Sequence, residues 1–379
     1  MKNVILTDVC DFQGGTQPPK NFWRKSNASG YVRMLQIRDF TQPEKDYIEY
    51  VKDTNNTKKC NEDDILIGRY GASIGKICTG LAGAYNVALI KTIPNKSLLD
   101  KRFLFYILKS LNFQKFIQSI GSRAAQAGFN KEDLSNFLIP LPPLDEQKRI
   151  AAILDAADLH RQKTKALLDK YDELAQALFL DMFGDPVTNP KGWEKEPFEY
   201  FAKFDTRMVN NFEDYLDYPH IGIGNIEKDS GKILGYNLVK DEDLKSGKYL
   251  FDSRHIIYSK IRPNLNKVAI PDFKGLCSAD SYPILVNGQH TNRIFFSSLL
   301  RSKDFIEFIL GHSTRTNIPK ANKAQMRLYY GIAPNIKLQN EFEKHIFLIE
   351  SQKSQAEKSL QKAEELFQSL LQKAFKGEL

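Results

Sequence analysis

Residues 143–184 read PLDEQKRIAAILDAADLHRQKTKALLDKYDELAQALFLDMFG, and this stretch decides the fold of the chain. Its seam residues recur at alternating intervals of four and three, and the apolar ones include Ile150, Leu154, Ala157, Leu168, Tyr171 and Leu178. That spacing is the heptad pattern of a helix whose apolar seam packs against a second helix. One charged residue, Arg161, interrupts the seam. We therefore expect one long helix that pairs with a partner.

The same seam recurs when 192 is added to each residue number, and we call two positions related by this offset equivalent. The apolar positions of the second seam include Phe342, Ile346, Ile349, Leu360, Phe367 and Leu370. Lys353 is equivalent to Arg161, and Phe375 is equivalent to Phe183. Two unrelated amphipathic helices would explain one such stripe each. Two stripes in the same register with the same charged interruption favour an internal duplication.

The length and composition are those of a globular protein. A chain of 379 residues predicts two or three domains, and 42% hydrophobic residues suffice for their cores. The four cysteines are scattered without a CxxC pair, which argues against a zinc cluster and a disulfide framework. No apolar run reaches the roughly 18 residues of a membrane span. The N-terminus lacks the features of a signal peptide, so we expect a soluble, cytoplasmic protein.

The positive charge is concentrated outside the two predicted helices. Residues 1–142 hold 20 Lys and Arg against 13 Asp and Glu, a net +7, and residues 185–334 hold 21 against 18, a net +3. The helical stretches 143–184 and 335–379 carry −2 and 0, from 6 against 8 and 7 against 7. A basic excess suits a polyanionic partner, although ordinary surface charge would produce a similar balance.

The two segments outside the helices follow one plan. In residues 1–142 we expect strands at 31–37, 64–67 and 85–92 and a helix at 101–120. In residues 185–334 the matching elements are strands at 255–258 and 277–286 and a helix at 294–310. The sequence thus predicts a mixed α/β (α+β) fold of two similar globules, 1–142 and 185–334, separated by two long helices, 143–184 and 335–379. We expect these helices to form an antiparallel coiled coil, with a pseudo-twofold internal repeat.

No candidate motif of a catalytic or metal site in the sequence matches the pattern that such a site requires. Residues 71–77, GASIGKI, resemble a phosphate loop but have three residues between the glycines instead of four, and Ile77 replaces the required Ser or Thr. The six histidines show no metal-ligand spacing, and no GxSxG elbow occurs. We therefore expect neither a catalytic residue nor a metal site in this chain.

The loops of both globules hold clusters of Arg, Lys, Asn and Gln. In the first globule these are Lys20, Arg24, Lys25, Arg69, Lys76, Arg123, Gln126, Asn130 and Lys131. In the second they are Lys260, Arg262, Asn264, Asn266, Lys267, Arg315, Asn317, Lys320 and Lys323. These side chains bind guanine and adenine edges or phosphates. Each alone could be a solvated loop residue, but matched clusters in both globules favour nucleic acid.

The helix length suits a reader of two separated sites. A helix of roughly 40 residues is about 60 Å long at 1.5 Å per residue. Half-sites one turn of DNA apart lie about 34 Å from centre to centre. Two globules held apart by paired helices would therefore read a split site with an unread spacer between its halves.

At this point the chain resembles, over its full length, the DNA specificity subunits of Type I restriction-modification systems. The resemblance is strongest at residues 139–147, IPLPPLDEQ, which lead into the first helix, and at 375–379, FKGEL. Residues 30–39, GYVRMLQIRD, and 260–267, KIRPNLNK, are similar to target-recognition sequences of that family. The second copy of the start motif departs from the pattern, since Asn335 replaces the second proline.

The resemblance implies a non-catalytic subunit in which each globule reads one half of a bipartite double-stranded DNA target. It implies that the helices set the spacer and dock two modification (methyltransferase) subunits, which carry S-adenosylmethionine and methylate adenine. Restriction subunits that use ATP and Mg would join them, and this chain itself would need no cofactor and no membrane.

Two other function classes stay open at this point. One is a coiled-coil scaffold that binds proteins through its globules without DNA specificity, and the small excess of +3 on the second globule supports it. The other is a self-sufficient enzyme with an unrecognised site. Selection from a random duplex library tests the scaffold, and a methyl-transfer assay on the isolated chain tests the enzyme.

Overall fold

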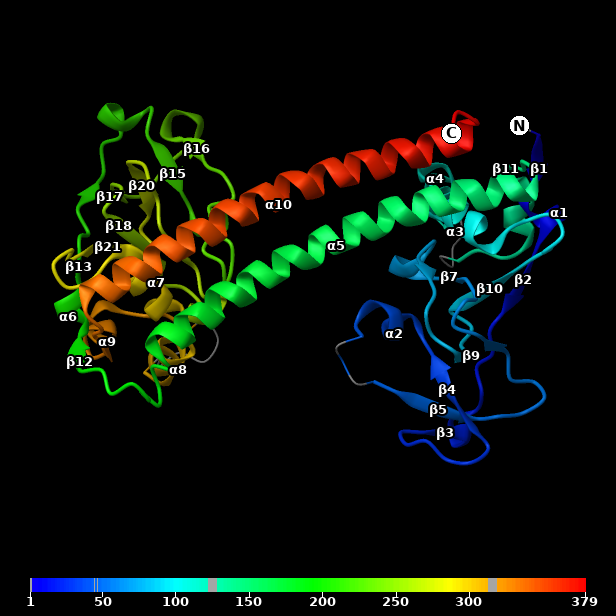
Figure 1. Cartoon of the computed structure of the whole chain (residues 1–379), viewed down its shortest axis with the longest axis horizontal. Coiled ribbons are helices and arrows are strands. Elements are labelled where there is room, and N and C mark those ends of the chain that lie inside the picture. The colour runs from blue at the N-terminus through cyan, green and yellow to red at the C-terminus, as the bar shows by residue number, and fades with distance from the viewer. Residues whose placement is uncertain (1, 44, 46, 122–127, 313–318) are drawn as a thin grey trace. The chain divides into compact units, whose positions relative to one another are not determined.

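The computed structural model describes residues 2–43, 45, 47–121, 128–312 and 319–379 (Figure 1). The chain divides into two compact units: unit 1 comprises residues 1–165 and 358–379, and unit 2 comprises residues 166–357. Two long helices, α5 (Leu144–Phe183) and α10 (Ile336–Lys376), each contribute to both units. The first part of α5 lies with the last part of α10 in unit 1, and the reverse holds in unit 2. The two helices are therefore antiparallel within each unit.

Unit 1 contains two sheets of four and five strands and a short strand pair. The four-stranded sheet has the order β2 (Cys10–Gly14), β10 (Leu89–Pro94), β7 (Leu66–Gly68), β8 (Ile77–Cys78). The five-stranded sheet has the order β3 (Trp23–Arg24), β5 (Glu49–Lys52), β4 (Tyr31–Leu35), β9 (Gly83–Tyr85), β6 (Lys59–Cys60). The pair is β1 (Asn3–Ile5) with β11 (Leu138–Pro140). The helices are α1 (Leu6–Val9), α2 (Ile37–Thr41), α3 (Lys101–Lys109) and α4 (Leu111–Gly121).

Unit 2 is built from the same kinds of element. Its four-stranded sheet has the order β13 (Ala202–Phe204), β21 (Ser281–Val286), β18 (His255–Ser259), β19 (Val268–Ala269). Its five-stranded sheet has the order β14 (Met208–Val209), β17 (Lys248–Phe251), β20 (Gly275–Ser278), β15 (Pro219–Ile221), β16 (Asn237–Leu238). The short pair is β12 (Lys195–Pro197) with β22 (Tyr330–Ile332). The helices are α6 (Phe198–Phe201), α7 (Arg293–Arg301), α8 (Lys303–Gly311) and α9 (Lys323–Arg327).

The scaffold of unit 2 repeats that of unit 1 at the offset found in the sequence. Helices α7 and α10 begin at positions equivalent to the first residues of α3 and α5, and strands β12 and β21 begin at positions equivalent to those of β1 and β10. The five-stranded sheets share four strands in one order, β5-β4-β9-β6 and β16-β15-β20-β17, with a parallel pair at the centre of each. The fifth strand differs, because β3 adds beside β5 whereas β14 adds beside β17. The units therefore share a frame and diverge in the five-stranded sheet.

The helices predicted at 101–120 and 294–310 are each broken in the middle, so that part of the prediction was wrong. Ser110 and Ser302, which are equivalent positions, have extended backbone with ψ of 150° and 154°. Each hydroxyl accepts a hydrogen bond of 3.3 Å from the amide three residues later, Phe113 and Phe305. Serine caps a helix N-terminus in this way, so the chain ends one helix and starts another.

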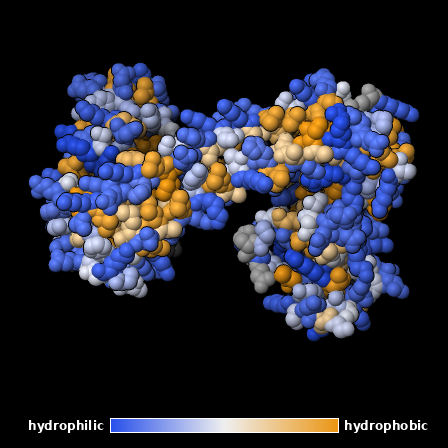
Figure 2. Space-filling view, in the orientation of Figure 1, coloured by the Kyte–Doolittle hydropathy of each residue, from blue (hydrophilic) through white to orange (hydrophobic). Residues whose placement is uncertain are grey.

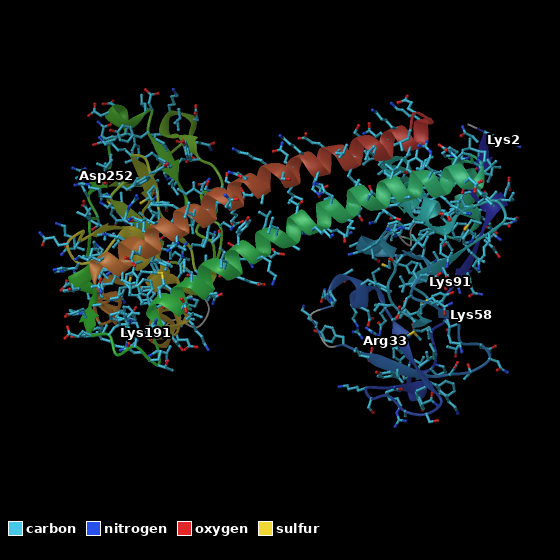
Figure 3. The ribbon with its side chains drawn as sticks, in the orientation of Figure 1. Lys2, Arg33, Lys58, Lys91, Lys191 and Asp252 are labelled. Atoms are coloured by element: carbon cyan, nitrogen blue, oxygen red, sulfur yellow. The ribbon has the colours of Figure 1, made fainter. Side chains whose placement is uncertain are left out.

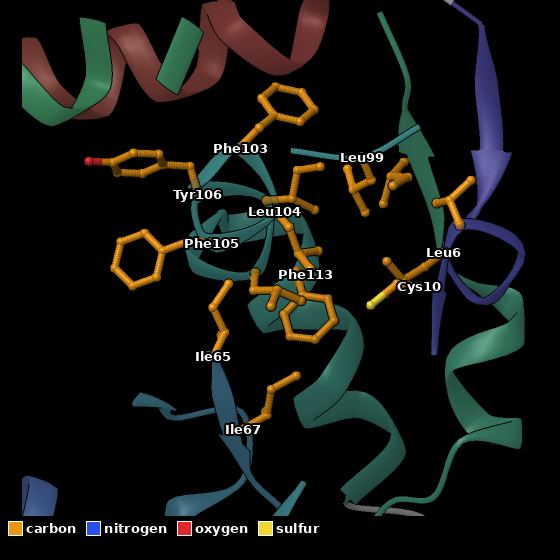
Figure 4. Close-up of a cluster of buried hydrophobic side chains, with 14 of the residues drawn as sticks. Leu6, Cys10, Ile65, Ile67, Leu99, Phe103, Leu104, Phe105, Tyr106 and Phe113 are labelled. Atoms are coloured by element: carbon orange, nitrogen blue, oxygen red, sulfur yellow. The ribbon is translucent and has the colours of Figure 1, made fainter. Parts of the chain in front are cut away.

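The core of unit 1 lies where α3 meets the long helices. Figure 4 shows Phe103 and Tyr106 on α3 in one buried cluster with Leu6 of α1 and with Leu99 and Ile65 from loops. The Phe103 ring centroid lies 5.8 Å from that of Phe375, and the Tyr106 centroid lies 6.1 Å from that of Phe367. Burying an aromatic side chain of this size contributes about 1.5–3 kcal/mol, so these contacts bind α10 firmly to α3.

The core of unit 2 uses the other ends of the same two helices. Phe179 and Phe183 of α5 lie with ring centroids 5.8 and 5.2 Å from that of Phe342 on α10. Both also contact Phe295 of α7, at 6.0 and 4.8 Å. In unit 1, therefore, aromatic rings join α10 to α3, whereas in unit 2 they join α5, α10 and α7.

The predicted seam positions are shielded from solvent to different degrees. Among them Ile150, Leu154, Phe342 and Phe367 are at most 4% exposed. The remaining seam residues are buried or half-buried, namely Ala157, Leu168, Tyr171, Leu178, Ile346, Ile349, Leu360 and Leu370.

A buried glutamine ties the start of each long helix to its unit. In unit 1, Gln147 donates to the Leu98 and Pro142 carbonyls, both at 2.8 Å, and accepts from the Asp100 amide at 2.8 Å. In unit 2, Gln339 donates to the His290 and Pro334 carbonyls, at 3.1 and 2.8 Å. It also accepts from the Asn292 amide at 3.2 Å and the Thr291 hydroxyl at 2.8 Å. The carbonyl and amide partners occupy equivalent positions, so the two anchors are copies.

The charged interruptions of the two seams form equivalent ion pairs between the helices. In unit 1, Arg161 of α5 pairs with Glu364 of α10 at 3.1 Å. In unit 2, Lys353 of α10 pairs with Asp172 of α5. Glu364 and Asp172 are equivalent positions, so each pair is the counterpart of the other. A polar pair inside an apolar seam favours one register of the two helices over shifted alternatives.

No helix in the described part of the chain is both long and apolar enough to cross a membrane.

Candidate nucleic-acid interface

In unit 1 the predicted residues lie in two separate places. Arg69 follows β7, and its Nε donates 3.1 Å to the Phe129 carbonyl. The neighbouring Tyr70 pairs with Gly128 in an isolated β-bridge. These contacts bring the loop after β7 to the segment that precedes Asn130 and Lys131. Lys76, at the end of the same loop, is exposed.

Asn130 and Lys131 are exposed but engaged within unit 1. The Asn130 side chain accepts from the Asp133 amide at 3.0 Å and so holds the first turn of the short 3-10 helix Glu132–Asn136. Lys131 pairs with Asp11 at 2.5 Å, and this hydrogen bond lowers the pKa of the Asp11 carboxyl. Both residues therefore stabilise the loop in the free protein.

Lys20 and Arg24 belong to a different part of unit 1, at the edge of the five-stranded sheet. Lys20 opens the short 3-10 helix Lys20–Phe22, and Arg24 lies on β3. Both side chains are exposed, and the Arg24 guanidinium lies 4.7 Å from the centroid of the Tyr31 ring. The structure therefore does not gather all the predicted residues of unit 1 into one patch.

In unit 2 the structure brings the loop after β18 against the segment before α9. The Arg262 amide donates 2.9 Å to the Pro319 carbonyl, and the Ala321 amide donates 2.9 Å to the Lys260 carbonyl. Ile261 and Lys320 form an isolated bridge. Lys260, Arg262 and Lys320 therefore come from two segments and lie together. Arg262 has a left-handed backbone, with φ of 51°, and Asn264 beside it is exposed.

Two predicted residues of unit 2 donate side-chain hydrogen bonds to backbone carbonyls. Asn266 also has a left-handed backbone, with φ of 50°, and its Nδ2 donates 3.2 Å to the Arg301 carbonyl. The Lys267 ammonium donates 2.8 Å to the Ile223 carbonyl. These bonds join the loop to α7 and to the short 3-10 helix Ile223–Asn225 after β15, so both side chains support the loop.

Four predicted residues, Arg123, Gln126, Arg315 and Asn317, lie outside the described residues. Gly128 and Lys320, which follow these residues in the chain, form isolated β-bridges with Tyr70 and Ile261.

A cluster that residue type alone did not single out lies on β4 and α2 of unit 1, where Figure 3 labels Arg33. Arg33 pairs with Asp39 at 2.9 Å, and Arg38 pairs with Glu49, which also accepts 2.8 Å from the Gln36 side chain. The Nε atoms of Arg33 and Arg38 are buried and have no hydrogen-bond partner among the described residues. Both arginines line a cavity of about 320 Å³. Guanidinium groups held in this way are suited to the O6 and N7 edge of guanine.

Unit 2 has a smaller cavity, of about 260 Å³, lined by Leu250 and Phe251 of β17 and by charged residues of the loops around that strand. Buried His255 lies between Asp252, at 2.9 Å, and Asp205, at 3.3 Å. The side-chain hydrogen bond from Arg254 holds the pKa of the Asp252 carboxyl well below its usual range. Figure 3 labels Asp252 in unit 2. This network orders the turn between β17 and β18.

All four cysteines are buried. Burial raises the pKa of the thiols, to about 11 for Cys60 and Cys78 and about 12 for Cys10 and Cys277. A thiol with such a pKa is a poor nucleophile. The described residues contain no group of three His, Cys, Asp or Glu that could hold a metal ion.

In the space-filling view the visible surface is mostly hydrophilic, with apolar residues in separate patches (Figure 2).

Comparison with known proteins connects these features to one family. A model of the Type I restriction modification DNA specificity domain matches residues 1–169. The chain is 29% identical over 352 residues to the Type I restriction enzyme EcoDI specificity subunit of Escherichia coli, covering 83% of this chain and 77% of that relative. It is 36% identical over 147 residues to the Type I restriction enzyme MjaVIII specificity subunit of Methanocaldococcus jannaschii, covering 39% and 34%.

Solved structures confirm the predicted fold class. The crystal structure of a Type I restriction-modification system S subunit from M. genitalium superposes with a TM-score of 0.60 at 16% identity, covering 99% of this chain and 96% of that one. A structure solved to explain complex assembly and conformational transition of the Type I system superposes with a TM-score of 0.58 at 14% identity, covering 100% and 98%. Residues 1–169 therefore match the Type I restriction modification DNA specificity domain, and the chain as a whole is similar in sequence and in fold to Type I specificity subunits.

Proposed function

We propose that this chain is the non-catalytic, sequence-specific DNA-binding subunit of a Type I restriction-modification complex. Each recognition domain, 1–142 and 185–334, reads one half of a bipartite target in double-stranded DNA. The helix segments 143–184 and 335–379 set the spacer between the halves and dock two methyltransferase subunits, which restriction subunits join.

The observation that carries this proposal is the repeated frame with divergent reading elements. Gln147 and Gln339 anchor equivalent helices through hydrogen bonds to equivalent backbone groups. The five-stranded sheets, in contrast, add their fifth strands at opposite edges. A constant frame with variable sheets and loops is what two readers of different sequences require.

The chemistry of the exposed side chains supports DNA over the alternative of a protein scaffold. The Arg33 and Arg38 guanidiniums are suited to guanine, and the lysines near Lys260 are suited to phosphate. The excess of +7 in residues 1–142 attracts a polyanion. The match of residues 1–169 with a DNA specificity domain favours the same reading.

In this proposal the chemical steps belong to the partner subunits. The methyltransferase subunits would carry S-adenosylmethionine and turn the target adenine out of the duplex before methylating it. ATP and Mg would act in the restriction subunits. This chain would position the partner subunits and determine the DNA sequence at which they act. Its DNA affinity would fall steeply with salt because phosphate contacts release counterions.

An exchange of residues 1–142 tests the proposal. That segment is replaced by the equivalent region of a specificity subunit with another target, and methylated adenines are mapped in host DNA. We expect one half of the methylated sequence to change while the other half stays as it was. The reciprocal exchange of residues 185–334 is the control and should alter the other half. If neither exchange alters the methylated sequence, the chain does not read DNA in two halves.

A further inference from the structure

A group of four cations surrounds two aromatic rings in unit 2. The Lys260 ammonium lies 5.3 Å from the centroid of the Tyr282 ring. The Lys323 ammonium lies 5.6 Å from the same centroid and 5.8 Å from that of Phe204. Arg327 lies at the other end of α9, with its guanidinium carbon 5.7 Å from the Phe204 centroid. Lys320 joins the group because the bridge with Ile261 places it beside Lys260.

Carboxylates balance only part of the charge of Lys260, Lys323 and Arg327. Arg327 pairs with Glu199 at 2.9 Å, but the carboxylate contact of Lys260 is a longer one to Asp280, at 3.8 Å. Neutral groups accept the hydrogen bonds of the two ammoniums, since Lys260 donates to the Ala279 carbonyl and Lys323 donates 2.6 Å to the Thr206 hydroxyl. Burial, and then the charges of Lys320 and Lys323, lower the pKa of Lys260. An anion placed here would relieve this mutual repulsion.

Unit 1 lacks most of this group at the equivalent positions. Gly68 and Gly128 are equivalent to Lys260 and Lys320, and Ile90 is equivalent to Tyr282. Lys131 is equivalent to Lys323, but its ammonium pairs with Asp11 at 2.5 Å. The cationic group is therefore an addition to unit 2 and not a feature of the shared frame.

The residue types favour phosphate over base edges as the ligand. A lysine ammonium is a compact point charge without the planar fork that distinguishes guanine from other bases. The aromatic rings under the ammoniums hold the aliphatic stems in place and leave the positive charge for an anion. Phosphates of the duplex backbone present that anion at regular intervals.

Building on the proposed function, we infer that Lys260, Lys320 and Lys323 form an anchor for the DNA backbone in the second recognition domain, to which the first domain has no equivalent among its described residues. The two domains thus contribute unequally to affinity. The second supplies a larger share of the phosphate contacts and of the salt dependence.

A salt titration of the full-length chain tests this inference. The triple variant Lys260→Gln, Lys320→Gln, Lys323→Gln removes the charges and nearly keeps the side-chain length. Binding to duplex DNA is measured by fluorescence anisotropy between 50 and 200 mM salt. The slope of log K against log salt is negative, and each lost phosphate contact makes it shallower by about 0.9. We therefore expect the magnitude of the slope to decrease by about 2 to 3 in the triple variant. The preferred sequence should stay the same, because phosphate contacts do not read bases.

Two controls separate this effect from a general change in charge. The variant Lys228→Gln, Lys240→Gln, Lys245→Gln removes three exposed charges elsewhere in unit 2 and should leave the slope near that of the wild type. Lys131→Gln, the unit 1 counterpart of Lys323→Gln, should have less effect than Lys323→Gln alone. If the triple variant unfolds, this single pair decides the question.

The outcomes are distinct for the inference and for the proposed function. An unchanged slope in the triple variant, or equal losses from Lys131→Gln and Lys323→Gln, overturns the anchor. A changed sequence preference also overturns it, since it would make these lysines base readers. If the wild-type chain binds no duplex, alone or co-expressed with the modification subunit of its host, the proposed function itself fails.

Discussion

At the scale of the residue, Gln147 joins three backbone groups at the start of α5. It is completely buried, and its amide meets the Leu98 and Pro142 carbonyls and the Asp100 amide. Gln339 repeats this arrangement at the start of α10. A single side chain in each unit therefore connects the globule to its long helix.

Replacing Gln147 with leucine should destabilise unit 1 strongly. The change leaves two carbonyls and one amide buried without partners, and each such group costs about 1–3 kcal/mol. We expect faster hydrogen–deuterium exchange across residues 144–150 and a lower free energy of unfolding. Lys148→Ala, one residue along on the exposed face, is the matched control and should change neither quantity. Normal protection in the leucine variant would show that the anchor is dispensable.

A second prediction at this scale concerns base reading by Arg33. Its guanidinium is held by Asp39 at 2.9 Å, so Arg33→Lys keeps the charge but loses the planar fork. Under the proposed function we expect discrimination at one base pair of one half-site to fall by about 1–3 kcal/mol. Competition binding against a library with each position of the target varied measures this loss. Equal weakening for all sequences would make Arg33 a phosphate contact.

The reading residues were only partly predictable from sequence. Lysines and arginines in loops can be found by composition, and Lys260 and Lys320 do come together. The cluster around Arg33 depends on Gln36 meeting Glu49, which lies 13 residues away across two paired strands. No local pattern encodes that meeting. Asn266 and Lys267 have the residue types of DNA contacts, yet their side-chain donors bind backbone carbonyls, and the buried Oδ1 of Asn266 has no hydrogen-bond partner among the described residues.

At the scale of the element, two ion pairs join α5 and α10. We expect a double-mutant cycle on Arg161→Met and Glu364→Gln to give a coupling of about 0.5–1 kcal/mol, as for other partly exposed pairs. The cycle on Lys353→Met and Asp172→Asn should give a similar value, because the pair is equivalent. Both values should fall in 1 M salt. A coupling in one pair and none in the other would contradict their equivalence.

Element boundaries were predictable where one pattern persists for many residues. A heptad repeat over 40 residues located α5 within one residue at each end, since the predicted stretch 143–184 compares with Leu144–Phe183. The breaks at Ser110 and Ser302 were not predicted, because a single serine ends each helix while the apolar spacing continues on both sides of it. The different edge positions of β3 and β14 were not predicted either, because strand order depends on pairing between segments that are far apart in the sequence.

At the scale of the whole molecule, the proposed function implies that the length of the two helices sets the spacer between the half-sites. Seven residues inserted between Ala166 and Leu167, and seven between Lys358 and Ser359, fall midway between the two ion pairs and keep both seams in register. The insertion adds about 10.5 Å, or about three base pairs of DNA. We expect the spacer of the methylated sequence to lengthen by that amount while both halves stay the same. Insertion into α5 alone is the control and should abolish specific binding, because the ion pairs then fall out of register.

The measurement that tests the central claim most directly is the mapping of methylated adenines in the host genome, with and without this chain. Two short defined sequences separated by a spacer of fixed length should be methylated, and deleting the chain should remove that methylation everywhere. Methylation at one uninterrupted sequence, or a pattern that persists after deletion, would contradict the account of two readers on a repeated frame.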